Sequence, residues 1–282
     1  MQEKIAIIAD TGCDLPQNTA DRYHIRMIPL RVVYEDREYI DRLDITPAEV
    51  YVRMPEKIPK TSLPNPGVIK TLFSDLVRDG YTHVIAIHIS SGLSGTYNAV
   101  KTVAQEFNDK LHIEVIDSKV LSMATGWLVL DVAQHAEAGW PFAEIVEHVR
   151  QKMSSSKVFF TLKTLHYLRV GGRINTVAAS LGAFLNLKPI ISVNEEGKYY
   201  TFAKVRGSVK ATGKLVKIAE NIINEGAVKL AVMHSGVQKE AEKILHKLQD
   251  MPNVKEFLLS EIGPALGVHT GPGLLGVTTL RI

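Results

Sequence analysis

The sequence has few of the features that mark secreted, membrane-spanning or nucleic-acid-binding proteins. Cys13 is the only cysteine, so no disulfide can form within the chain, and this usage fits a reducing cytoplasm. The 33 lysines and arginines nearly balance the 30 aspartates and glutamates, and no basic stripe favours nucleic acid. The first ten residues resemble a strand rather than a signal peptide, and the most apolar helix candidate, residues 120–133, is shorter than the ~20 residues that cross a bilayer. We therefore expect a cytoplasmic protein with no transmembrane segment and no nucleic-acid partner.

Several motifs of catalysis and cofactor binding are also missing. No Walker loop and no His-Glu-x-x-His sequence occurs, so we expect no cofactor and no metal. Residues Gly271–Gly276 have the glycine spacing of a dinucleotide-binding loop. Such a loop must be followed by a helix and a second strand, and neither follows here, so we reject this motif. Asp10-Thr-Gly resembles an aspartic-protease signature, but no second copy supplies the other carboxylate of the catalytic pair. Residues 92–96 miss the Gly-x-Ser-x-Gly motif of esterases by one position. His83 and His88 face opposite sides of one predicted strand and cannot share a metal ion.

The pattern that is present predicts a two-domain α/β protein. The chain has 282 residues, of which 45% are hydrophobic and 22% charged. Its polar run at residues 151–157 suggests an N-terminal domain, residues 1–156, and a C-terminal domain, residues 157–282. In the first, strands and helices alternate, which indicates a mainly parallel sheet flanked by helices. The second predicts a mixed α/β arrangement with a hairpin at Asn194–Gly197. The strands are expected at residues 4–9, 26–34, 83–90, 112–116, 158–161, 189–193, 198–205, 229–234, 254–259 and 276–281, and the helices at 66–79, 95–107, 120–138, 141–153, 178–187, 208–223 and 239–248.

Residues Ser90–Tyr97 carry the strongest functional signal. They form a turn rich in hydroxyls and glycines between a predicted buried strand and a predicted helix. Free backbone N–H groups at a helix N-terminus attract anions, and Ser94 or Thr96 can add a hydroxyl donor. A capped helix with closely packed glycines is the alternative interpretation, but two serines beside two glycines exceed what a cap requires. We therefore expect this turn to hold a small anionic group, at the carboxyl end of a parallel strand where α/β folds bind ligands.

Two further segments carry polar side chains in constrained backbone. Thr61 and Ser62 precede Pro64 and Pro66 in a rigid, extended turn, although Ser62 and the following asparagine could serve only as helix caps. His269 lies in a segment with glycine and proline on both sides, predicted to be a loop, where an imidazole can donate to a carboxylate or phosphate.

Together these motifs resemble the DegV family over essentially the whole chain, about residues 3–281. Each motif alone is weak, but their order and spacing are specific to that family. The matching segments are Thr61-Ser62-x-Pro64-x-Pro66, Ser91–Tyr97, Val115–Ser118, Leu168–Ile174, Lys188–Val193 and His269–Gly273.

The resemblance implies a two-domain DegV-like fold that encloses one long-chain fatty acid, such as palmitate. It also implies a non-catalytic role, in which the protein presents the carboxylate to the catalytic subunit of a fatty acid kinase. By motif match, Thr61 and Ser94 should hold the carboxylate, and Ser62 and His269 should make secondary contacts.

The chain departs from the family pattern at two places. Leu63 stands where the family often has glutamine, and Thr11-Gly-Cys replaces the usual Ser-Thr-Ala near the first strand. Neither change removes a proposed carboxylate ligand. Arg173 and Arg206 lie in family segments, but the sequence does not assign them roles.

Simple energetics agree with a lipid ligand. Burying the roughly 14 methylenes of a sixteen-carbon acid is worth ~0.8 kcal/mol each, or about 11 kcal/mol before entropic costs. A hydrogen bond to the charged head adds only about 1.5–3 kcal/mol, so the tail would dominate affinity and the hydroxyls would set orientation. The small and apolar residues of 120–133 and 178–187 are the expected tail lining.

Two other functions stay open at this point. One is a serine acyl-hydrolase that uses Ser94, His269 and Asp117. The other is a phosphotransfer domain, because the fold is also similar to part of the dihydroxyacetone kinases. Chain-length preference, oligomeric state and the identity of the kinase do not follow from the sequence.

Overall fold

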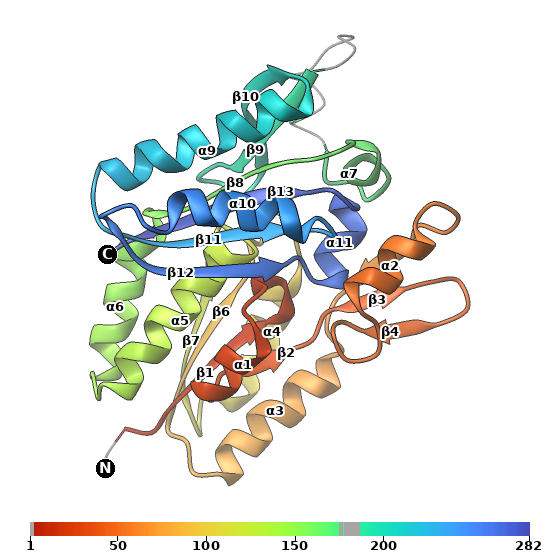
Figure 1. Cartoon of the computed structure of the whole chain (residues 1–282). Coiled ribbons are helices and arrows are strands. Elements are labelled where there is room, and N and C mark those ends of the chain that lie inside the picture. The colour runs from red at the N-terminus through yellow and green to blue at the C-terminus, as the bar shows by residue number, and fades with distance from the viewer. Residues whose placement is uncertain (1–2, 175–176, 178–186) are drawn as a thin grey trace.

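The computed structural model describes residues 3–174, 177 and 187–282, and it contains three sheets (Figure 1). A four-stranded parallel sheet has the order β2-β1-β6-β7, a six-stranded mixed sheet has the order β10-β9-β8-β13-β11-β12, and a small antiparallel sheet has the order β4-β3-β5. Within these ranges, no helix is both long and apolar enough to cross a bilayer.

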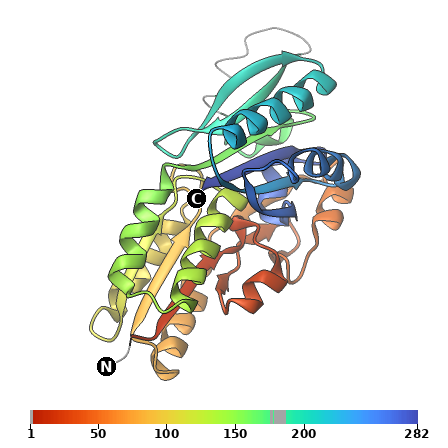
Figure 2. The same cartoon turned by 60° about the vertical axis from the view of Figure 1, so that its left-hand side comes forward.

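The parallel sheet is covered by helices on both faces because its central strands alternate between two apolar surfaces. Ala6 and Ile8 of β1 face a core shared with the helices α3 and α4, whereas Ile7 and Ala9 face the core that contains Trp127 of α5. Figure 2 shows α5 and α6 along one side of this sheet. The elements are β1 Ile5–Asp10, β2 Arg26–Ile28, β6 His83–His88, β7 His112–Asp117, α1 Gln17–Arg22, α3 Pro66–Arg78, α4 Thr96–Ala104, α5 Met123–Glu137 and α6 Phe142–Met153, with 3₁₀ turns η1 Thr11–Cys13 and η2 Gln105–Phe107.

The six-stranded sheet is built from the C-terminal half of the chain. Its pairs are antiparallel except β11 with β12, and the predicted hairpin at Asn194–Gly197 is confirmed as the connection between β9 and β10. One face packs on α9 and α10, and the other joins the core of α5. Its elements are β8 Ser156–Thr161, β9 Leu187–Val193, β10 Tyr199–Arg206, β11 Val228–His234, β12 Val254–Glu261, β13 Leu275–Arg281, α7 His166–Val170, α9 Ser208–Asn224, α10 Gln238–Leu248 and α11 Pro264–Thr270.

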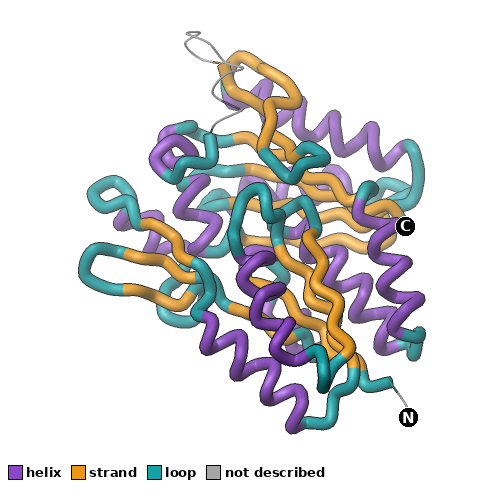
Figure 3. The backbone as a smooth tube through the Cα atoms, turned by 180° about the vertical axis from the view of Figure 1, so that it is seen from behind, coloured by secondary structure: helices purple, strands orange, loops and turns teal. Residues whose placement is uncertain are grey.

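The third sheet stands out from the side of the molecule together with α2 (Pro47–Arg53), as Figure 3 shows from behind. Its strands are β3 Arg31–Val33, β4 Glu38–Ile40 and β5 Lys60–Ser62. The sequence predicted one strand over residues 26–34, and this is wrong, because β2 ends at Ile28 and β3 joins a different sheet. Pro29 explains the break, since it cannot donate a ladder hydrogen bond.

Two other predictions need comment. His269 was expected in a loop, but it lies in the last turn of the short helix α11. Most of the predicted helix 178–187 lies outside the described residues, apart from Leu187, which begins β9.

The largest core includes side chains from both halves, such as Trp127 and Phe160. The division into domains 1–156 and 157–282 therefore stays a prediction.

Candidate functional site

Three of the four predicted ligand residues line one pocket. Thr61 reaches it from β5, Ser94 from the turn before α4, and His269 from α11. Arg173, which follows α7, is the fourth polar residue of the lining among those that the structure describes. The cavity measures about 40 Å³, and the other described residues of its walls are apolar: Leu30, Ile89, Leu93, Leu121, Tyr199, Ala265 and Leu266.

Helix α11 is held in place by two buried carboxylates from the N-terminal half. Asp14 Oδ1 accepts from the backbone N–H of Gly263 at 2.9 Å and from the Arg42 guanidinium at 2.7 Å. Asp41 Oδ1 accepts from the N–H of Ala265 at 3.0 Å, in the first turn of the helix. Negative side chains stabilise a helix N-terminus, so these bonds determine where His269 points.

The imidazole of His269 is paired with Thr61. The distance between Thr61 Oγ1 and His269 Nε2 is 2.9 Å. Burial, together with the nearby Arg173 charge, lowers the pKa of His269 to about 4, so the ring is neutral at pH 7. Its Nδ1 atom has no hydrogen-bond partner among the described residues. Gly171 makes room for that side of the ring, because a Cβ there would lie 2.2 Å from Nδ1.

The Ser94 turn offers hydroxyls rather than free amides. The N–H groups of Leu93 and Ser94 both donate to the Ser90 carbonyl at 3.0 Å, and the N–H of Thr96 donates to Ser94 Oγ at 3.3 Å. Ser94 Oγ also lies 2.8 Å from Thr96 Oγ1. These three N–H groups therefore do not form the backbone anion cradle that the sequence suggested.

The other polar residues of the turn serve its structure. Ser90 Oγ donates to the Gly197 carbonyl at 2.7 Å, which fastens the turn to the β9–β10 hairpin. Ser91 donates to Asp117 through its N–H and its hydroxyl, and Lys119 lies 2.7 Å from the same carboxylate. Asp117 is thus engaged with these neighbours rather than with His269.

Ser62 is not part of the pocket lining. Neighbouring residues of a strand point to opposite faces, and Ser62 Oγ donates to Glu38 Oε1 at 3.0 Å, whereas Thr61 faces the cavity. A ligand contact by Ser62 stays a prediction of the sequence pattern.

Arg173 is a site residue to which the sequence assigned no role. Its guanidinium donates to the carbonyls of Leu93 and Gly171 and supplies positive charge at the pocket. The Gly-Gly-Arg motif was a visible signal, but only the structure brings it beside Ser94. Arg206, by contrast, lies exposed at the end of β10.

A second, smaller cavity lies next to the first. Leu121, Tyr199 and Leu266 line both cavities. The second measures about 20 Å³, and its remaining walls are mostly apolar side chains: Ser122, Val158, Phe160, Met233, Ile262, Thr270 and Leu274. Of the predicted tail lining 120–133, only Leu121 and Ser122 border these cavities, while Trp127 is fully buried in the core.

Two other reactive groups are structural. The buried His88 contacts Asp10 through Nδ1 and Oδ2 at 2.9 Å, which joins β6 to the end of β1. Cys13 is fully buried, and burial followed by the Asp10 charge raises the pKa of its thiol. A thiol in such surroundings is a poor nucleophile.

Comparisons with known proteins agree with this architecture. Residues 4–281 match a family described as uncharacterised proteins of the DegV family. A DegV domain-containing protein of Clostridium acetobutylicum is 40% identical over 279 residues, which are 99% of each chain. Another, from Clostridium perfringens, is 40% identical over 276 residues, or 98% of each chain.

Solved structures with the same fold are described as fatty acid-binding proteins. A DegV family protein of Thermus thermophilus has a TM-score of 0.92 at 28% identity, over 99% of this chain and 100% of that one. DegV of Bacillus subtilis has a TM-score of 0.91 at 27% identity, with the same coverage. A stearic acid-binding protein of Eubacterium ventriosum has a TM-score of 0.90 at 27% identity, over 98% of each chain.

Proposed function

The chain belongs to the DegV family, and we propose on that basis that it binds a long-chain fatty acid and presents the carboxylate to a partner kinase. The observation that carries the proposal is that a polar pocket and an apolar cavity are neighbours that share lining residues. Thr61, Ser94, His269 and Arg173 surround one end, and the walls beyond Leu121 and Leu266 are largely hydrocarbon. This is the polarity profile of a fatty acid.

The head group would be held by hydroxyls, one imidazole and one guanidinium. Thr61 and Ser94 donate O–H bonds, and His269 donates through a ring N–H. Arg173 supplies the charge that opposes the carboxylate. Because the imidazole is neutral, the site holds the anion with one full positive charge, which suits a ligand that must later be transferred.

The cavities must widen to admit the tail. They measure about 40 and 20 Å³, whereas pockets for ligands of this size are about 300–1,000 Å³. The methylenes supply the driving force, at ~0.8 kcal/mol each. We therefore expect the affinity for fatty acids to rise steeply with acyl chain length, up to the length at which the cavity can widen no further.

Access for a kinase is supported by the position of Leu63. The residue is 47% exposed, and its side chain packs beside Gly95, where a Cβ would lie 3.1 Å from Leu63 Cδ2. The head-group end of the pocket thus lies close to the surface, beside the residue at which this chain departs from the usual family glutamine. We expect Leu63 to contribute to the surface on which the kinase docks.

Native mass spectrometry of gently purified protein tests ligand binding. The expected result is one co-purifying acid of sixteen to eighteen carbons, with affinity for added acids increasing from C10 to C16. A protein that is empty and does not take up labelled palmitate would contradict the proposal.

A reconstituted assay tests the presentation of the carboxylate. A kinase recovered with the protein should phosphorylate palmitate only when the protein is present. Phosphorylation of dihydroxyacetone instead would indicate the phosphotransfer alternative.

A further inference from the structure

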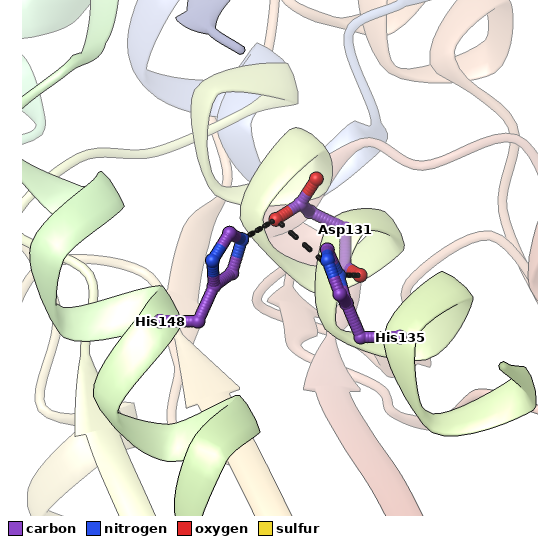
Figure 4. Close-up of side chains that lie close together, drawn as sticks. All are labelled: Asp131, His135 and His148. Atoms are coloured by element: carbon purple, nitrogen blue, oxygen red, sulfur yellow. Dashed lines mark hydrogen bonds and ion pairs between the residues drawn. The ribbon is translucent and has the colours of Figure 1, made fainter. Parts of the chain in front are cut away.

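A second cluster of ligating side chains lies away from the pocket, between α5 and α6. Asp131 and His135 are one turn apart on α5, and His148 faces them from α6 (Figure 4). One ligand atom from each residue lies within 4.8 Å of the other two. In the part of the chain that the structure describes, no other trio of histidine, cysteine or acidic residues meets this distance.

We propose that Asp131, His135 and His148 form a binding site for a transition-metal dication, with Zn²⁺ as the best fit. Two imidazoles and one carboxylate are a donor set that holds zinc in other proteins, and three protein ligands leave a fourth position for water. Calcium and magnesium prefer all-oxygen sites and fit this set poorly.

The distances are compatible with tetrahedral coordination after small movements. At zinc bond lengths of about 2.0–2.2 Å, ligand atoms in a tetrahedron are about 3.3 Å apart. Asp131 Oδ2 lies 2.7 Å from His148 Nε2 and 3.8 Å from His135 Nδ1, so the required spacing falls between the two observed values. His135 Nδ1 would have to exchange its present hydrogen bond, to the Asp131 carbonyl at 2.7 Å, for the metal.

The surroundings hold the carboxylate in the required orientation. Asp131 Oδ1 lies 3.2 Å from Lys229 Nζ, which leaves Oδ2 for the imidazoles, and such outer partners commonly orient metal ligands. Lys229 also pairs with Glu256 at 3.1 Å, so the two carboxylates exceed the one lysine charge by one negative charge. That excess favours a bound cation.

The cluster is partly open to solvent and separate from the fatty acid site. The His135 and His148 side chains are 21% and 20% exposed, which gives a metal ion access. Ser122, which borders the second cavity, lies at the start of α5, and Asp131 lies nine residues further along. At 1.5 Å per residue, the two positions are about 13 Å apart along the helix axis. The metal would link α5 to α6, and the inference does not depend on fatty acid binding.

Calorimetric titration of chelator-treated, full-length protein with ZnCl₂ tests the site. We expect one saturable equivalent, which His135→Asn and His148→Asn each weaken at least tenfold. The matched control is His112→Asn, since His112 and His83 form another close imidazole pair with ring centroids 4.9 Å apart. The control should change the affinity less than twofold. Three results would overturn the proposal. They are no saturable zinc binding by the wild-type protein, wild-type zinc affinity in the His135 and His148 variants, and loss of zinc binding in the His112 control.

A fluorescence measurement tests the site with Asp131, His135 and His148 all in place, so its result does not depend on whether the histidine variants fold. The Trp140 ring centroid lies 4.2 Å from that of His135 and 5.7 Å from that of His148. One equivalent of Cu²⁺ should quench the protein's fluorescence. Trp140→Phe should reduce this quenching while leaving zinc affinity unchanged, and the remainder belongs to Trp127, which lies one turn before Asp131 on α5. Quenching that is undiminished in Trp140→Phe would place the metal elsewhere and overturn the assignment.

Discussion

Thr61 Oγ1 and His269 Nε2 lie 2.9 Å apart, although 208 positions separate the two residues in the sequence. The pair joins the small antiparallel sheet to α11 at the polar end of the cavity. Each side chain gives the other a hydrogen-bond partner in a largely buried place, and a carboxylate that enters can replace that contact with its own. Several consequences of this arrangement can be measured.

Replacing Thr61 by valine should weaken fatty acid binding about 10- to 100-fold. The substitution keeps the shape and removes one hydroxyl, and a hydrogen bond to a charged group is worth about 1.5–3 kcal/mol. Titration with palmitate measures the effect. Ser62→Ala is the matched control, because Ser62 bonds to Glu38 outside the lining, and it should change affinity less than twofold. Equal losses in both variants would favour the sequence-based assignment of Ser62 to the carboxylate.

Gly171→Ala should reduce binding at least tenfold. A methyl group would come within 2.2 Å of His269 Nδ1 and force the ring away from Thr61. Gly213→Ala in α9 is the control, since no atom lies within 4 Å of its Cβ position, and it should leave binding unchanged. Histidine NMR signals would show whether the ring has moved. Wild-type affinity in Gly171→Ala would contradict the proposed role of His269.

Removing the Arg173 charge should affect anionic ligands selectively. Arg173→Gln is expected to weaken palmitate at least tenfold and to change hexadecanol binding little, because the alcohol has the same tail without the charge. The pKa of His269 should also rise, since Arg173 contributes to lowering it. Equal losses for acid and alcohol would show that Arg173 acts on packing rather than on charge.

The stability of the ligand-free protein should depend on His269 between about pH 4 and 6.5. Burial lowers the pKa of His269 from 6.5 to about 4, so in this window the unfolded state binds the extra proton and stability increases with pH. The full effect is on the order of 3 kcal/mol.

Asp41 has the opposite effect, because burial raises its pKa from 3.8 to about 6 and stability then falls as pH rises through that range. Thermal melts at several pH values should therefore show a flatter or falling profile for His269→Gln and a steeper rise for Asp41→Asn. If the stability of His269→Gln varied with pH in parallel with that of the wild type, the pKa of His269 would be the same in the folded and unfolded states, which would contradict this prediction.

Ser94 should not react as a nucleophile. Its hydroxyl is bonded to Thr96, His269 is bonded to Thr61, and Asp117 is engaged by Ser91 and Lys119. Incubation with a fluorophosphonate should give no adduct by mass spectrometry, and Ser94→Ala should lower palmitate affinity about tenfold or more. A covalent adduct on Ser94 would instead support the acyl-hydrolase alternative.

Local patterns predicted most of the secondary structure well. The alternation of strands and helices, the hairpin at Asn194–Gly197 and the long helices α3, α5 and α6 are visible in periodicity and in turn residues. The break at Pro29 and the helix at His269 were missed, and so were the short elements α1, α2, β4, β5 and α7. A strand's choice between two sheets depends on partners far along the chain, and α11 is fixed by Asp14 and Asp41 rather than by helix propensity.

The sequence by itself determined the family, the mixed α/β class and the residue types of the site, because motif order and hydrophobic period are properties of the chain. Only the tertiary structure decided which side chains share a cavity. Thr61 and Ser62 are neighbours in sequence but face opposite sides of β5, so one lines the pocket and the other meets Glu38. Arg173 joins the site, and His148 meets Asp131, only because packing brings distant elements together. Such contacts arise from long-range burial and ion pairing, which no local pattern encodes.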